Sequence, residues 1–133
     1  ILKEKPKEKW CRKCSKCAFA FTMFAPYVDS VKLRDMFGGS LFADESLLPL
    51  FRELLGMEGI KPFECVGTPE ETKAALYLVH QQKGHAGTPV MNMFEKEVLP
   101  TMKNPEELVK ECLTPVQEHA IPKEFLNILK DIA

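Results

Sequence analysis

The feature that most constrains this chain is a helix start signal that recurs three times in its second half. Each copy is a capping residue followed by proline: Thr68-Pro69, Thr88-Pro89 and Asn104-Pro105. Threonine and asparagine accept hydrogen bonds from the free N–H groups of a first helical turn, and proline is well tolerated at the first helical position. Two copies also carry glutamates in that turn, which strengthens the signal. The sequence therefore predicts helices over 69–83, 89–99 and 105–113.

Other segments extend this helical pattern. The apolar run 17–28 indicates a buried core helix, and segments 30–37 and 44–55 indicate helices that end at glycines. A last helix is predicted to begin at Pro122 with its apolar residues on one face. Strand signals are limited to one short candidate over 62–66. We therefore predict an all-α fold, a compact multi-helix domain with at most that one short strand.

Charge and composition exclude several classes of protein. The net charge is −1, so neither nucleic acid nor a membrane surface is expected as a partner. No apolar run approaches the ~20 residues that a membrane-spanning helix needs. The five cysteines are odd in number and unevenly spaced, which favours reduced thiols in the cytoplasm over a secreted disulfide framework.

The start of the chain indicates a linker. It begins with Ile1 and continues with a lysine-rich stretch, so we expect it to be part of a longer protein. We assign residues 1–10 to a linker or to the end of an upstream domain, and residues 11–133 to a helical C-terminal domain. The pair Gly38-Gly39 indicates a helix stop, not a phosphate-binding loop. The chain alone is therefore expected neither to bind ATP nor to act as an enzyme.

Three cysteines stand at three-residue intervals, at Cys11, Cys14 and Cys17. Thiolates at this spacing can converge on one metal ion, and the neighbouring lysines and arginine favour the charged form. A structural zinc site has four ligands, so a fourth is expected from Cys65, from a histidine or from upstream residues. An iron–sulfur run needs a further cysteine where Phe21 stands, which favours zinc. The alternative without metal is that these cysteines are small, buried apolar side chains.

Two separated segments carry motifs that are specific enough to indicate a family. The first begins Cys11-x-x-Cys-x-Lys-Cys-Ala-Phe-x-Phe21 and leads to Ala25-Pro26, and the second is Lys61-Pro-Phe-Glu-Cys-Val-Gly67, followed by Glu70 or Glu71. Over residues 10–71 the chain resembles the C-terminal region of the bacterial UDP-N-acetylmuramoyl-L-alanyl-L-glutamate epimerase family (MurL). The cysteine segment is also similar to the closing part of the PP-loop ATP pyrophosphatases.

The resemblance implies an accessory C-terminal domain of an ATP-dependent epimerase that inverts the terminal glutamate of a UDP-MurNAc-dipeptide. It also implies ATP and magnesium for the parent enzyme, an upstream catalytic domain as partner, and a UDP-sugar peptide as substrate. ATP would activate the glutamate as an acyl-adenylate, so that an acid and a base can move its α-proton. Lys61 and Glu64 are candidate catalytic residues because they lie in the second family-like segment, and Cys65 is the candidate fourth zinc ligand for the same reason.

Two other functions fit the residues. One is a non-catalytic, zinc-stabilised helical module that mediates protein interaction, and the other is an independent thiol or iron–sulfur protein. His80, His85 and His119 are each expected to be exposed side chains, with His85, which lies between glycines, as the most accessible.

Overall fold

The structure is a computed structural model that describes residues 9–58 and 66–114 together with Pro122 and Phe125. These residues form six α-helices and no strand, which confirms the all-α prediction for the described part of the chain. Residues 62–65 of the candidate strand and the helix predicted from Pro122 fall largely outside the described residues. The helices are α1 (Ser15–Phe24), α2 (Ser30–Phe37), α3 (Leu48–Leu54), α4 (Pro69–Gln82), α5 (Pro89–Met93) and α6 (Pro105–Leu113).

The predicted helix starts at Pro69, Pro89 and Pro105 are confirmed, although the Thr88 side chain makes no capping hydrogen bond. The Thr68 side chain accepts the Glu71 backbone N–H, and the Glu71 carboxylate accepts the Thr68 backbone N–H, which forms a capping box before α4. Asn104 accepts from the Glu107 N–H in the same way before α6. The end of α4 differs from the prediction, because Lys83 and not Gly84 adopts the left-handed conformation, with φ of 59°.

Prolines explain where the observed helices depart from the predicted ranges. Within the predicted helix 44–55, the stretch Glu45–Leu47 is a 3₁₀ turn (η2) and α3 begins only at Leu48. Pro49 would clash with the carbonyl of residue 45 in an α-helix that began at residue 44, whereas it is tolerated in the first turn of α3. Similarly, α5 passes into a π-helical turn, η3 (Phe94–Val98), and then a 3₁₀ turn, η4 (Leu99–Thr101), which contains Pro100.

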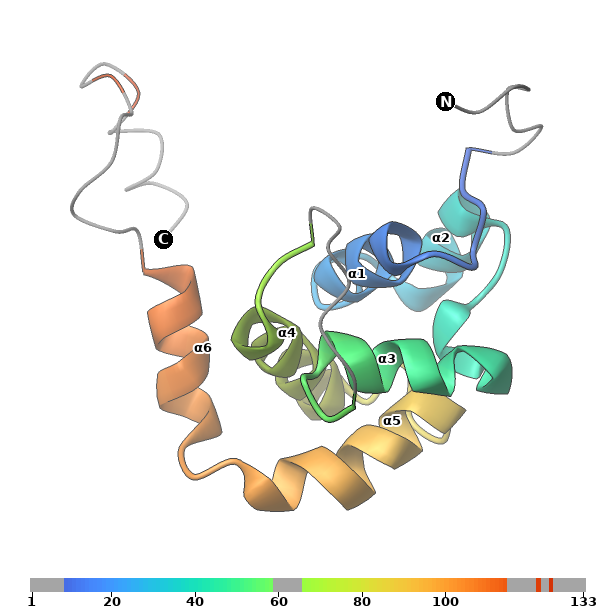
Figure 1. Cartoon of the computed structure of the whole chain (residues 1–133). Helices are drawn as coiled ribbons and strands as arrows, with labels where there is room; N and C mark the ends of the chain where they lie inside the picture. Colours follow the sequence, from blue (N-terminus) through green and yellow to red (C-terminus); the bar gives the residue numbers. More distant parts are fainter. Residues whose placement is uncertain (1–8, 59–65, 115–121, 123–124, 126–133) are drawn as a thin grey trace.

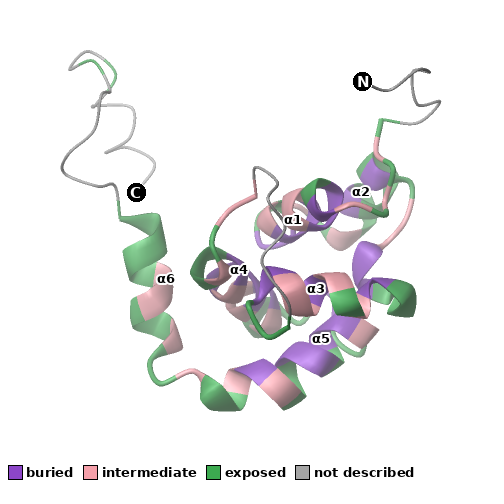
Figure 2. Ribbon diagram, viewed as in Figure 1, coloured by how far each residue is buried: buried purple, intermediate pink, exposed green. Residues whose placement is uncertain are grey.

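The core is a set of aromatic rings between α1, α2, α3 and the 3₁₀ turn η1 (Leu41–Ala43). Phe21 lies at its centre and meets Phe37 and Phe42 edge to face, with ring centroids 5.1 and 4.9 Å apart. Phe42 meets Phe51 of α3 in the same geometry at 5.7 Å. Figure 2 shows the buried residues on the faces of α1, α3 and α5 that point towards one another. Packing around Phe21 therefore holds α1 against α2 and η1.

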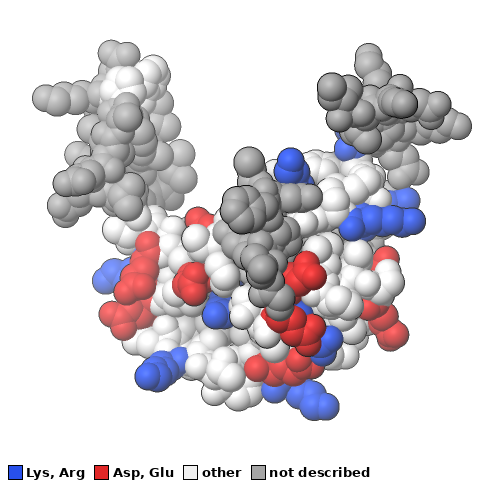
Figure 3. Space-filling view, in the orientation of Figure 1, with Lys and Arg blue, Asp and Glu red and all other residues white. Residues whose placement is uncertain are grey.

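The remaining elements surround this core. Arg52 of α3 forms a bidentate ion pair with Glu97 of η3, with N–O distances of 2.8 and 3.1 Å. α6 lies beside α4 at the edge of the molecule and has no buried residue (Figure 1). Acidic and basic side chains are interspersed over the face drawn in Figure 3, as the near-zero net charge leads one to expect. No helix in the described ranges is long and apolar enough to cross a membrane.

Candidate metal centre

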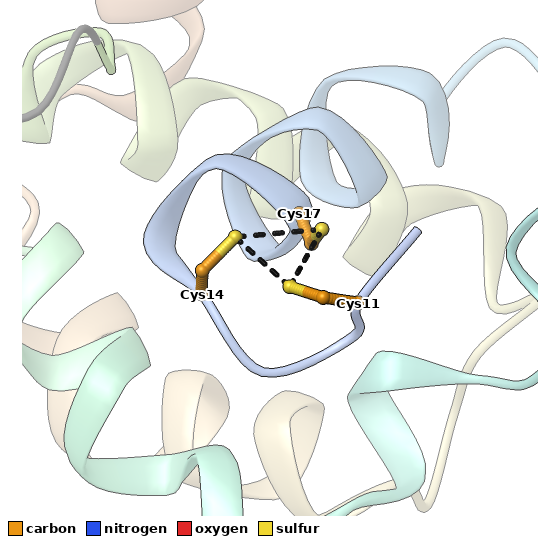
Figure 4. Close-up of side chains that lie close together, drawn as sticks. All are labelled: Cys11, Cys14 and Cys17. Atoms are coloured by element: carbon orange, nitrogen blue, oxygen red, sulfur yellow. Dashed lines mark hydrogen bonds between the residues drawn. The ribbon is translucent and has the colours of Figure 1, made fainter. Parts of the chain in front are cut away.

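The structure brings the three clustered cysteines together at the start of α1. The Sγ atoms of Cys11 and Cys14 are 3.2 Å apart, and each lies 3.5 Å from Sγ of Cys17. Figure 4 shows the three side chains pointing into one space enclosed by the turn and the first residues of α1. All three are free thiols. The predicted convergence of these cysteines is therefore observed.

Each thiol comes from a different local environment. Cys17 lies on the buried face of α1 and is 5% exposed. Cys14 is the N-cap residue of α1, in an extended conformation, and its side chain makes no capping hydrogen bond to the helix. Cys11 is exposed and precedes a sharp reversal at Arg12, whose φ of 59° lies in the left-handed region. This reversal turns Cys11 back towards the other two sulfurs.

Two contacts hold the turn against the end of α2. The Arg12 guanidinium donates to the carbonyl oxygen of Gly38, the left-handed cap residue of α2. A Cβ atom at Gly39 would lie 3.2 Å from Nη1 of Arg12, so the second glycine leaves room for this close approach. Trp10 stacks on Phe37, with ring centroids 4.3 Å apart. We call residues 11–14 the cysteine turn. The Gly38-Gly39 pair, predicted as a helix stop, is thus also the place where this turn contacts the end of α2.

The surroundings of Cys11 and Cys17 give their thiols different pKa values. Hydrogen bonding from the backbone of Lys13, assisted by the other two thiols, lowers the pKa of Cys11 to about 7. Burial raises the pKa of Cys17 to about 11. Cys11 therefore forms a thiolate more readily than Cys17 when no cation is present.

A hollow opens beside Cys11. Its wall includes Lys13, Ser40 and Asp44. Asp44 caps η2 by accepting the Ser46 backbone N–H at 3.0 Å, so its carboxylate already has a structural partner. Among the described residues, no fourth cysteine, histidine or carboxylate joins the three thiols.

The other predicted site residues are not placed by the structure. Lys61, Glu64 and Cys65 lie outside the described residues, and so does His119. The described end of their segment packs on α1: a Cβ atom at Gly67 would overlap both the Phe19 ring and the Glu71 carboxylate. Because residue 67 is glycine, its backbone can lie against the ring of Phe19, which follows Cys17 by two residues on α1.

The prediction that His85 is the most accessible histidine is wrong. His85 is only 7% exposed and meets the rings of Phe21 and Phe42 edge to face, with centroids 6.0 and 5.2 Å away. Its Nε2 atom is buried with no hydrogen-bond partner in the described part of the chain. His80, in contrast, is partly exposed and contacts Glu95 at 2.9 Å. The glycines around His85 indicated a loop, but they carried no signal that the loop folds onto the aromatic core.

The buried imidazole predicts a pH dependence of stability. Burial, followed by the charge of Arg34, lowers the pKa of His85, although Asp29 opposes the shift. Because the unfolded chain takes up this proton first, the unfolding free energy should fall as the pH drops below about 6.5, by up to about 1.4 kcal/mol per pH unit. His85→Phe should flatten this part of the profile, measured by urea unfolding between pH 5 and pH 8. The matched variant His80→Gln leaves His85 in place and should keep the slope. Equal slopes in wild type and His85→Phe would contradict this assignment.

The chain matches one protein family over most of its length. Residues 2–109 match the family described as MurL C-terminal domain. The chain is 38% identical over 122 residues to the UDP-N-acetyl-alpha-D-muramoyl-L-alanyl-L-glutamate epimerase of Micromonospora sp., a match that covers 92% of this chain and 27% of that protein. It is 47% identical over 85 residues to the enzyme of the same name from Salinispora tropica, which covers 64% of this chain and 19% of that protein.

A third relative has the same name. The epimerase of Xanthomonas oryzae pv. oryzae is 32% identical over 123 residues, and the match covers 92% of this chain and 27% of that protein. The chain thus spans 27% or less of the length of these three relatives. No solved structure matches the chain. The family match takes in the cysteine turn, helices α1 to α5, the segment before α4, and α6 as far as Val109, and the chain therefore belongs to the MurL C-terminal domain family.

Proposed function

We propose that this chain serves as the C-terminal accessory domain of an ATP-dependent epimerase that inverts the terminal glutamate of a UDP-MurNAc-dipeptide, a precursor of peptidoglycan. The observation that carries this proposal is membership of the MurL C-terminal domain family together with the names of the three relatives. The same observation favours this function over a free-standing zinc-stabilised interaction module.

The proposed partner is an upstream catalytic domain of the same protein. The relatives are much longer than the matched region, which leaves room in each of them for such a domain. In this chain, Gly38 caps the end of α2, and the backbone N–H groups of Gly38 and Gly39 both donate to the Arg34 carbonyl, so they are not free to cradle a phosphate. We therefore assign ATP and magnesium to the upstream domain. Reduced thiols and a nucleotide-linked substrate support a cytoplasmic location.

The proposed chemistry divides between the two parts. Activation by ATP would remove the carboxylate charge beside the developing carbanion, which makes the α-proton of the glutamate accessible to a general base. Lys61 and Glu64 stay as candidates for contacts to the substrate from this chain.

A domain exchange tests the proposal. The matching region of the Xanthomonas oryzae epimerase is deleted, or replaced by this chain, and D-glutamate is measured by chiral chromatography after hydrolysis of the UDP-MurNAc-dipeptide product. Deletion should reduce inversion by at least about 100-fold, equivalent to about 2.7 kcal/mol in transition-state free energy, and replacement should restore it. The chain alone should invert nothing. A folded exchange protein that leaves the glutamate in its L form, or a deletion that retains full activity, would contradict the proposal.

A further inference from the structure

The distances between the three sulfur atoms distinguish a site for a single metal ion from a site for an iron–sulfur cluster. A tetrahedral zinc site with Zn–S bonds of about 2.3 Å holds its sulfurs about 3.8 Å apart. The observed separations of 3.2 to 3.5 Å are about 0.3 to 0.6 Å shorter than that value, so a small outward movement of the three side chains would admit one ion. In a 4Fe–4S cluster each cysteine binds a different iron, and in a 2Fe–2S cluster only two cysteines share one, so three thiolates of a cluster cannot all lie as close together as the ligands of a single ion. The geometry therefore fits one ion.

The backbone gives a second, independent observation. Arg12 is a non-glycine residue in the left-handed region, a conformation that costs on the order of 1 kcal/mol and persists where the surroundings enforce it. Its guanidinium contact with Gly38 and the Trp10–Phe37 stack hold the turn in place. The result of this strained turn is to direct Cys11 at Cys14 and Cys17 (Figure 4).

We infer that Cys11, Cys14 and Cys17 bind a single zinc ion, which fixes the segment before α1 to the helical domain. Thiolate ligands in tetrahedral geometry select zinc or iron among the common metals, and zinc brings no redox chemistry to a site that is partly exposed. The names of the relatives assign no metal to this region. The role is structural, because the ion would join two parts of the backbone. One is the N-cap of α1, where no side chain caps the helix, and the other is the turn that Arg12 holds against α2.

Metal analysis of the whole chain, purified without chelator, tests the inference. About one equivalent of zinc per chain is expected. Cys11→Ser, Cys14→Ser and Cys17→Ser should each weaken zinc binding by at least about 100-fold, because the loss of a ligand exceeds the 10–100-fold effect of losing a group that only supports one. Cys112→Ser is the matched control, because Cys112 is an exposed free thiol outside the cluster, and it should bind zinc as wild type does.

A second test, cobalt substitution, uses the wild-type chain, so its result does not depend on whether the cysteine variants fold. Co²⁺ in this site should show the intense d–d bands of tetrahedral coordination and a thiolate charge-transfer band that zinc abolishes. Less than about 0.1 equivalent of zinc in folded protein with freely reactive thiols would overturn the inference. The cysteines would then be small apolar side chains that bind no metal. Stoichiometric iron with acid-labile sulfide would overturn it in favour of a cluster, and equal loss of zinc in Cys112→Ser would overturn the ligand assignment.

Discussion

Truncation of Phe21 to alanine is expected to lower the free energy of unfolding by about 3–5 kcal/mol. Phe21 is completely buried and lies edge to face against Phe37 and Phe42, so its removal leaves a cavity between helices that cannot close without moving α1. Phe24→Ala is the matched control on the same helix. Phe24 is 42% exposed, and its loss should cost about 1 kcal/mol or less.

The measurement is urea unfolding followed by far-ultraviolet circular dichroism for both variants under the same conditions. The Phe21 variant should show the lower midpoint by a clear margin, with a slope close to that of wild type. Similar losses in the two variants would mean that the aromatic cluster does not dominate the stability of the domain. Because Phe21 and Cys17 are four residues apart on one face of α1, a loosened core should also weaken metal retention in the Phe21 variant.

Local chemistry made the helix starts predictable. The capping interactions of Thr68 and Asn104 involve residues within one helical turn, so a sequence pattern contains every group that takes part. The range 30–37 was predicted fully because Asp29 caps its start and Gly38 supplies the left-handed residue at its end. For such elements the sequence carries the signal directly.

Features that depend on distant contacts were not predictable in this way. His85 is buried because Phe21 and Phe42, from other parts of the chain, present their ring faces and edges to its loop. The π-helical turn at Phe94–Val98 places Glu97 opposite Arg52, which is 45 residues away in sequence. Neither relation has a local signature, because the partners meet only after the core has formed.

The candidate site shows the same division. The spacing of Cys11, Cys14 and Cys17 was sufficient to predict that they converge, since all three lie within seven consecutive residues. The anchors of that turn were missed, because Arg12 meets Gly38 across 26 residues. The Gly38-Gly39 pair was the available signal, since two consecutive glycines often mark close approach by another group as well as a helix end.

Cys65→Ser is expected to weaken zinc binding by at least about 100-fold, because the sequence predicts Cys65 as the fourth ligand although it lies outside the described residues. Competition with a chromophoric chelator would measure the affinity, with Cys112→Ser as the control. The cobalt charge-transfer band should also lose about a quarter of its intensity as four thiolates become three. Unchanged affinity would instead assign the fourth position to a group other than Cys65.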